Sequence, residues 1–205
     1  WWGPKTFRES SSNAAVCATP TAGASGTLPG VVFSISDSME LTHEQQVRFL
    51  FTASAFGMVV ANNAMIAGAM GGCQAEVGSA SAMSAAAAVE AAGGTPQQCS
   101  EAFSIALGNL LGLVCDPVAG LVEIPCVKRN ALGAGNALIA ADMALAGITN
   151  VIPADETIEA MRSIGRRMPS ELRETGLGGT AGTRTGLAIK MKIFGQDVSL
   201  EKEEE

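Results

Sequence analysis

The stretch Ser79–Ala92, SASAMSAAAAVEAA, constrains the fold of this chain most, because nearly all of its residues are small. Alanine is the strongest helix former, and the Gly93-Gly94 pair directly after the stretch provides a helix stop. The chain is 47% hydrophobic but only 4% aromatic, and it contains 24 glycines. Small side chains let neighbouring helices approach closely. We therefore expect an all-α fold, a single domain of closely packed Ala- and Gly-rich helices.

Two capping boxes mark further helix starts. Thr42 is followed three residues later by Gln45, and Thr95 is followed at the same spacing by Gln98. In this motif the threonine and glutamine side chains bond reciprocally to the first free backbone N–H groups of the helix. Pro96 stands at the first helical position of the second box, where its missing N–H costs nothing.

The second half of the chain predicts two more helices, and the N-terminal half holds one ambiguous run. Cys126–Ala146 predicts a long helix, and Asp155 is expected to cap a short amphipathic one. The apolar face of that short helix consists of Ile158, Met161 and Ile164. Leu28–Ile35 is the only plausible β run, although it is equally compatible with a loop or a helix.

Glycine-rich junctions separate the predicted helices. They are Ala18–Gly30, Gly68–Gly78, Gly112–Pro125 and Gly176–Gly186. Such loops can present backbone N–H groups to an anion, or they can be plain connectors. The first junction is rich in hydroxyl groups, and we expect its Thr19, Thr21 and Ser25 to contact a substrate carboxylate.

Charge and composition exclude several function classes. The net charge of −7 argues against a nucleic-acid surface, which needs clustered Lys and Arg. The run Phe49–Met70 is long enough to cross a membrane, but it contains Asn62-Asn63 and lacks basic flanks, so a buried helix hairpin is the better prediction. Charged residues make up only 16% of the chain, which suggests that a partner subunit covers part of the surface.

Three of the five cysteines stand beside Gly or Pro, where the backbone turns. Cys73 lies in GGCQAEVG, Cys115 in LGLVCDPVAG and Cys126 in VEIPCVKRNA. Three soft ligands at such spacings suit an iron–sulfur cluster or zinc better than a disulfide framework. An odd number of cysteines that matches no secreted scaffold favours a reducing, cytoplasmic location.

The stretches CATPTAGASG, FLFTASAFGMVVANNA, GGCQAEVGSAS, GLVCDPVAGLVEIPCVKRNA and MPSELRETGLGG resemble the catalytic α subunit of the bacterial iron–sulfur-dependent L-serine dehydratases. The resemblance covers residues 13–195, which it implies are the catalytic domain. It leaves residues 1–12 as an irregular leader, read as truncated or non-native, and residues 196–205 as an acidic tail.

The resemblance implies a lyase of amino-acid degradation and gluconeogenesis that converts L-serine to pyruvate and ammonia without pyridoxal phosphate. It assigns Cys73, Cys115 and Cys126 as ligands of a [4Fe–4S] cluster whose fourth iron stays open. The relatives' two-chain members imply a regulatory β subunit, and a homo-oligomer is the other expected partner. Because this sequence ends in EKEEE and not in cysteine, we expect no capping of the open iron from that end.

The base that removes the α-proton stays unassigned. Glu76 is expected to orient the ligand loop, and Arg129 to bind the substrate carboxylate or to form an ion pair. Asn63 is a further candidate substrate contact; together with Asn62 and Asn130 it is expected to be a buried polar group near the site. Cys17 is a possible transient fourth ligand, whereas Cys99 is expected to lie mid-helix without a ligand role.

Three alternatives remain open. The chain is a non-catalytic scaffold with a structural zinc or an empty three-cysteine site, or a membrane helix hairpin. The nearest chemical alternative is a pyridoxal-phosphate dehydratase, but that enzyme needs an alternating strand–helix pattern that the sequence lacks.

Overall fold

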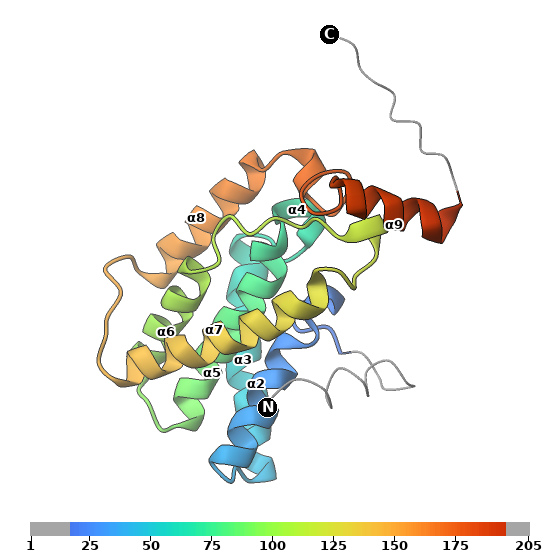
Figure 1. Cartoon of the computed structure of the whole chain (residues 1–205). Coiled ribbons are helices and arrows are strands. Elements are labelled where there is room, and N and C mark those ends of the chain that lie inside the picture. The colour runs from blue at the N-terminus through green and yellow to red at the C-terminus, as the bar shows by residue number, and fades with distance from the viewer. Residues whose placement is uncertain (1–16, 196–205) are drawn as a thin grey trace.

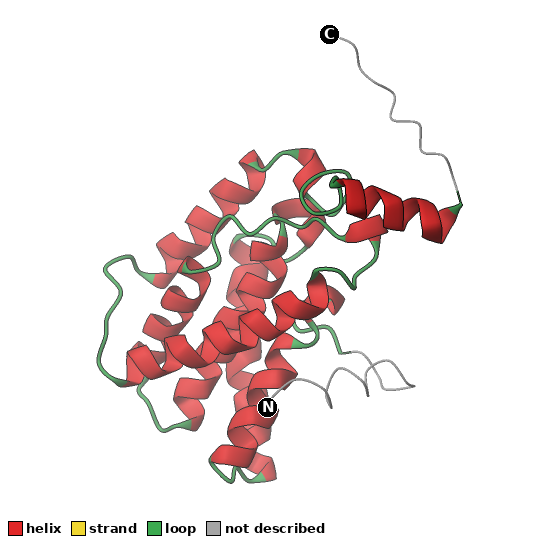
Figure 2. Ribbon diagram, viewed as in Figure 1, coloured by secondary structure: helices red, strands yellow, loops and turns green. Residues whose placement is uncertain are grey.

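The computed structural model describes residues 17–195, which form an all-α domain with eight α-helices and no β-strand (Figure 2). The predicted fold class is therefore confirmed. The predicted leader and acidic tail lie outside the described residues. The helices are α2 (Thr27–Ser38), α3 (His43–Asn63), α4 (Gly68–Gly71), α5 (Ser79–Ala91), α6 (Pro96–Gly108), α7 (Cys126–Leu145), α8 (Ala154–Arg167) and α9 (Arg184–Phe194).

Helix α5 is the centre of the domain (Figure 1). It packs against α2, α3, α6 and α7, and every residue from Ser79 to Val89 is buried. Two of its serine hydroxyls donate to backbone carbonyls: Ser84 Oγ donates to Ala80 O at 2.7 Å, and Ser81 Oγ donates to Gly133 O at 2.8 Å. A helix that is buried all round shows no amphipathic pattern, so its composition, and not its periodicity, reveals its place in the core.

Glycines on the surrounding helices permit the close approach that the composition predicts. A Cβ added to Gly57 of α3 would lie 2.7 Å from Met83 Cε on α5. A Cβ added to Gly133 of α7 would lie 2.7 Å from Val77 Cγ1. Both distances are shorter than van der Waals contact, so a larger residue at either position forces its neighbour to move.

Both capping boxes are present. Gln45 N donates to Thr42 Oγ1 at 3.3 Å, and Thr42 N donates to Gln45 Oε1 at 2.8 Å. The Thr95 box has the corresponding distances of 3.2 and 2.9 Å. The sequence therefore predicted the starts of α3 and α6 correctly.

The structure resolves one open expectation and corrects another. The ambiguous run Leu28–Ile35 lies in α2, because its buried residues recur at the helical spacing of three and four positions. They are Leu28, Val31, Val32 and Ile35. Asp155 does not cap α8: Pro153 occupies the N-cap, and Asp155 lies exposed in the first turn, where its charge favours the helix dipole.

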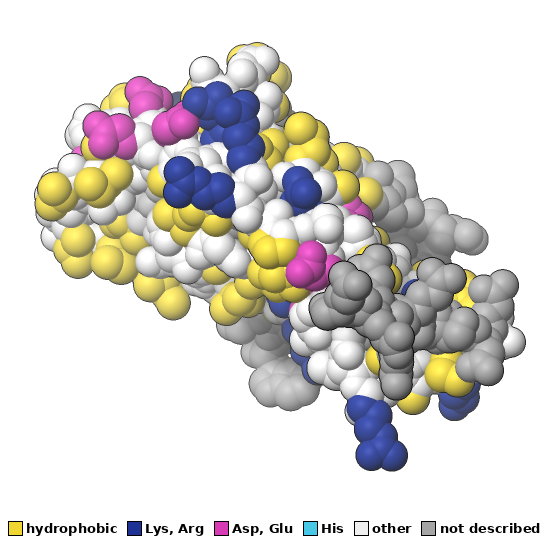
Figure 3. All heavy atoms as spheres, turned by 90° about the horizontal axis from the view of Figure 1, so that it is seen from above, with side chains coloured by type: hydrophobic (Ala, Val, Ile, Leu, Met, Phe, Trp, Pro, Cys, Tyr) yellow, Lys and Arg dark blue, Asp and Glu magenta, His cyan; other side chains and the backbone are white. Residues whose placement is uncertain are grey.

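The predicted buried hairpin over Phe49–Met70 is also wrong. Helix α3 buries one face only and exposes Phe51 and Met58, and a turn then leads to the four-residue α4. Among residues 17–195, no helix combines the length and the apolar character that crossing a membrane requires. Other hydrophobic side chains are also exposed, and Figure 3 shows them between small groups of charged residues on one face.

Four short helical turns complete the domain: η1 (Ala22–Ala24), the π-helix η2 (Gln74–Gly78), η3 (Val118–Gly120) and η4 (Ser170–Leu172). Elements η1, η2 and the beginning of α7 contact one another at one end of the helical core, and α4 packs against η2 there (Figure 1). The glycine-rich junctions therefore converge at this end of the domain.

Candidate functional site

Cys73 lies between α4 and the π-helix η2. Gly72 precedes it with φ of +76°, a conformation that side chains disfavour, so the chain turns sharply just before the cysteine. Gln74 N donates to Leu113 O at 2.9 Å, which ties this turn to the segment that leads to Cys115. Single-turn π-helices are frequent at functional sites; Cys73 is the N-cap of this one, and Glu76 lies within it.

Cys115 lies in an extended segment that pairs with the late part of the chain. Cys115 N donates to Leu172 O at 2.8 Å, and Glu174 N donates to Cys115 O at 2.7 Å, which makes one isolated bridge to Arg173. The MPSELRETGLGG stretch therefore fixes the backbone of a predicted ligand, although it is far away in the sequence.

Cys126 is the first residue of α7, and Asn130 one turn later connects it to the first junction. The Asn130 carbonyl Oδ1 accepts hydrogen bonds from Gly26 N at 3.0 Å and Thr27 Oγ1 at 2.9 Å. Its amide donates to Gly23 O at 2.8 Å and Cys126 O at 3.0 Å. The expectation that Asn130 is a buried polar group near the site is confirmed, and its role is to hold the hydroxyl-rich loop beside Cys126.

The structure brings two of the three predicted cysteines together and adds one carboxylate. Ligand atoms of Cys73, Cys115 and Glu76 lie within 4.8 Å of one another, and all three residues are buried. Cys126 is also buried, and its thiol lies close enough to Cys73 for a charge on Cys73 to raise the pKa of Cys126. All five cysteines of the sequence are free thiols.

The thiols differ in their tendency to ionise. A hydrogen bond from the Cys115 thiol lowers the pKa of Cys73 against the opposing effect of burial, and the Arg129 guanidinium lowers it further. The same hydrogen bond and burial raise the pKa of Cys115. Burial raises the pKa of Cys126 to about 11. These shifts therefore favour ionisation of Cys73 over ionisation of Cys115 and Cys126.

Arg129 is held by an ion pair, which is one of its two expected roles. Its Nη1 lies 2.7 Å from Asp116 Oδ1 and donates to Val114 O at 2.6 Å. Asp116 is buried in turn, and its Oδ2 accepts from Thr180 N at 2.6 Å. Gly179 is needed beside this carboxylate, because a Cβ there would collide with Asp116 Oδ2. Arg129 is thus a fixed positive charge beside Cys73.

Glu76 lies between the first junction and α4. Thr21 Oγ1 donates to Glu76 Oε1 at 2.8 Å. A Cβ on Gly23 would lie 2.8 Å from Glu76 Oε2, and one on Gly68 would lie 2.9 Å from it. Burial raises the pKa of Glu76, and the Thr21 hydrogen bond opposes that shift. From the sequence we expected Glu76 only to orient the ligand loop. Its three-residue spacing from Cys73, within one helical turn, is the signal that both side chains reach the same site.

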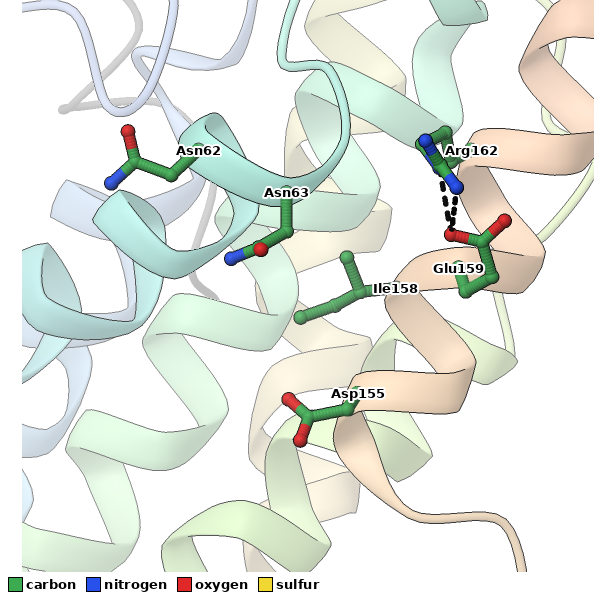
Figure 4. A pocket seen from close by; sticks show the side chains of 6 residues that line it. All are labelled: Asn62, Asn63, Asp155, Ile158, Glu159 and Arg162. Carbon is green, nitrogen blue, oxygen red and sulfur yellow. Dashed lines mark hydrogen bonds and ion pairs between the residues drawn. The ribbon is translucent and has the colours of Figure 1, made fainter.

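The other predicted substrate contacts fall in different places. Thr19 Oγ1 is buried and has no hydrogen-bond partner among the described residues, whereas Ser25 is half-buried at the end of η1. Asn62 and Asn63 are exposed, so the expectation that they are buried is wrong. They line an open pocket of about 530 Å³ between α3 and α8, whose lining contains none of the cysteines (Figure 4). A substrate role for Asn63 stays a prediction.

The two remaining cysteines are separate from this group. Cys99 is buried on α6 within the main hydrophobic core, as expected for a mid-helix position. Cys17 is exposed at the first described position.

Together, the fold and the site define an all-helical protein in which two cysteines from distant segments, Cys73 and Cys115, meet with Glu76 at a buried, glycine-lined centre. Residues 5–181 match the family described as "Serine dehydratase alpha chain". The chain belongs to this family, and the resemblance inferred from the sequence is confirmed.

Several relatives share most of this chain. It is 71% identical over 187 residues to the "Probable L-serine dehydratase, alpha chain" of Latilactobacillus sakei, covering 91% of this chain and 90% of that protein. The protein of the same name from Bacillus subtilis is 67% identical over 88% of this chain, and the "L-serine dehydratase, alpha chain" of Peptoniphilus asaccharolyticus is 48% identical over 90%. This chain spans 60% and 63% of the lengths of those two proteins.

Proposed function

We propose that this protein is an L-serine dehydratase that converts L-serine to pyruvate and ammonia, with a [4Fe–4S] cluster held by Cys73, Cys115 and Cys126. The observation that supports the proposal is the buried pair of Cys73 and Cys115, with Cys126 also buried, in a member of the serine dehydratase alpha chain family. Its relatives in Latilactobacillus and Peptoniphilus, which are named L-serine dehydratases, support the substrate.

The donor set fits an iron–sulfur cluster. Thiolates are the protein ligands that such clusters use, and three of them leave one iron without a protein ligand. Arg129, fixed by Asp116, offsets the negative charge that thiolates bring into a buried site. When bound, the cluster supplies a Lewis acid for the serine hydroxyl, which is otherwise a poor leaving group.

The residues of the first junction bind and orient the substrate in this proposal. The buried Thr19 hydroxyl has no partner among the described residues, which suits a donor to the substrate carboxylate. Asn130 fixes this loop against α7, so the hydroxyls are positioned before the substrate arrives. The reaction removes the α-proton and the hydroxyl group of serine, and hydrolysis of the resulting enamine gives pyruvate and ammonia.

We further propose that a β chain or a second copy covers part of this protein. Relatives are named alpha chains, which supports a multi-chain enzyme. The low content of charged residues and the many exposed hydrophobic side chains are compatible with a covered surface. Examples that are at least half exposed include Phe33, Phe51, Met58, Val122, Leu132 and Ile139.

The decisive experiment measures pyruvate formation from L-serine before and after anaerobic reconstitution with iron and sulfide, with and without the β chain. Brown protein with iron and sulfide in near-equal amounts, and activity only after reconstitution, is the expected result. Zinc without sulfide would support the scaffold alternative instead. A lysine adduct trapped by borohydride would support a pyridoxal-phosphate enzyme.

A further inference from the structure

Glu76 is the one carboxylate that shares the 4.8 Å group with cysteine ligand atoms in residues 17–195. Its side chain is only 8% exposed, and Oε1 is already engaged by the Thr21 hydroxyl. Oε2 lies against the Cα atoms of Gly23 and Gly68, two positions where any side chain would collide with it. The sequence thus leaves this oxygen free of covering side chains.

The charges around Glu76 do not satisfy it. The fixed cation of the site, Arg129, is paired with Asp116 and not with Glu76. Glu174 repels Glu76, and besides the Thr21 hydroxyl only a backbone hydrogen bond from Gly68 favours its charged form. A buried carboxylate is ordinarily paired with a cation or fully hydrogen-bonded, so a charged partner for Glu76 is missing from the described residues.

L-Serine carries the cation that Glu76 lacks. Its α-ammonium group has three N–H donors, and a carboxylate oxygen with free lone pairs is the acceptor that matches it best. The hydroxyls of the first junction are neutral donors and suit the opposite pole, the substrate carboxylate. We propose that Glu76 is the counter-ion that binds the α-ammonium group of the substrate and thereby selects amino acids over hydroxy acids.

An ammonium group at Oε2 would pair with this buried carboxylate, which forms no ion pair with any described cation. The isolated carboxylate is therefore held in an environment that a cationic ligand improves. This inference rests on the proposed function for the identity of the substrate, but the recognition of an ammonium group can be measured without turnover.

The experiment compares two ligands that differ only by the ammonium group. L-Alanine and propanoate both lack the hydroxyl and are not dehydrated, so calorimetry with the reconstituted protein reports binding alone. The wild type is expected to prefer L-alanine. Glu76→Gln keeps the acceptor for Thr21 but removes the charge, and it should weaken L-alanine roughly tenfold to a hundredfold while leaving propanoate within about twofold. Glu171→Gln, an exposed charge change, is the matched control and should alter neither.

Kinetics with L-serine separates this role from a proton-transfer role. Loss of the counter-ion raises KM by the same factor as the L-alanine affinity falls, whereas loss of a base lowers kcat and leaves L-alanine binding intact. The latter pattern, or equal weakening of both ligands, overturns the proposal. If Glu76→Gln fails to fold, Thr21→Val, which frees the carboxylate to rotate, should weaken L-alanine selectively by a smaller factor.

The inference and the proposed function can fail separately. Reconstituted wild type that does not consume L-serine, yet prefers L-alanine to propanoate through Glu76, would refute the dehydratase and retain the ammonium site. If the protein consumes L-serine but Glu76→Gln leaves the preference for L-alanine over propanoate unchanged, the dehydratase proposal stands and the ammonium site is refuted.

Discussion

The helix α5 and the cysteine site are both buried, but they are built in opposite ways. From Ser79 to Val89, α5 is regular backbone with small side chains, and the serines noted above bond to nearby carbonyls. The site is made of a π-helix, a 3₁₀ turn and one isolated bridge, and it buries Glu76 and Asp116. Regular structure satisfies the backbone by itself, whereas the irregular site needs side chains such as Asn130 to do so. Stability and chemistry are therefore located in different parts of one domain.

The largest expected effect belongs to the cysteines themselves. Cys73→Ser or Cys115→Ser removes a thiolate from a three-ligand set, so we expect cluster iron and serine turnover to fall to background after reconstitution. Cys99→Ala is the matched control, because Cys99 is equally buried but belongs to the core. It should keep its iron and lose about 1 kcal/mol of stability. Retention of iron by both site variants would contradict the ligand assignment.

The ion pair of Asp116 tests how firmly the site is built into the fold. The Asp116 side chain is 2% exposed and the Arg129 side chain is 15% exposed. Asp116→Ala leaves the Arg129 charge without its partner, so it should lower the free energy of unfolding by about 3–5 kcal/mol. Asp116→Asn keeps an acceptor for Thr180 N and should cost less. Urea unfolding of the protein without the cluster measures both. Equal midpoints for wild type and Asp116→Ala would show that the pair does not contribute to stability.

Two glycines of α7, Gly133 and Gly135, test how closely the helices of the core are packed. Gly133→Ala places a methyl group 2.7 Å from Val77 Cγ1 and 3.1 Å from Thr27 Cγ2, so we expect a loss of about 1–3 kcal/mol. Gly135→Ala, two residues along the same helix, has no atom within 4 Å of its new methyl group and should gain about 0.5–1 kcal/mol. Thermal unfolding of the two variants checks this. If both substitutions raise the unfolding temperature, helix propensity outweighs the contact with Val77 at position 133.

The part of the molecule that follows local rules was predictable from the sequence. The capping boxes and the Ala-rich stretch identify α3, α5 and α6, because these signals act over four residues or through composition. The contexts of Cys73, Cys115 and Cys126 suggested a metal site, but their joint assignment as cluster ligands came from the resemblance, since no local pattern encodes contacts between segments 42 and 11 residues apart. Arg129 could not be assigned to one of its two roles, because Asp116 and the Thr180 backbone decide it through tertiary contact.

The wrong and the open expectations share one cause. Asn62 and Asn63 were expected to be buried polar groups near the site, but α3 buries only one face and both asparagines are exposed. The run Leu28–Ile35 stayed open between strand, loop and helix, because a short apolar run fits either period until its neighbours are known. In both cases tertiary packing decided which face of the segment was buried.

Substitutions in the capping box of α3 should have the smallest effect on stability. They also test whether the helical core can be destabilised without changing the cysteine site. Thr42→Ala removes the acceptor for Gln45 N at an exposed helix start and should lower the free energy of unfolding by about 1 kcal/mol. Thr42→Ser keeps the hydroxyl and should stay within about 0.5 kcal/mol of the wild type. Because α3 contributes none of the cysteines, neither substitution should change iron content or the KM for L-serine. A change in iron content that follows the loss of stability would mean that the core and the site do not behave as the separate regions that their construction suggests.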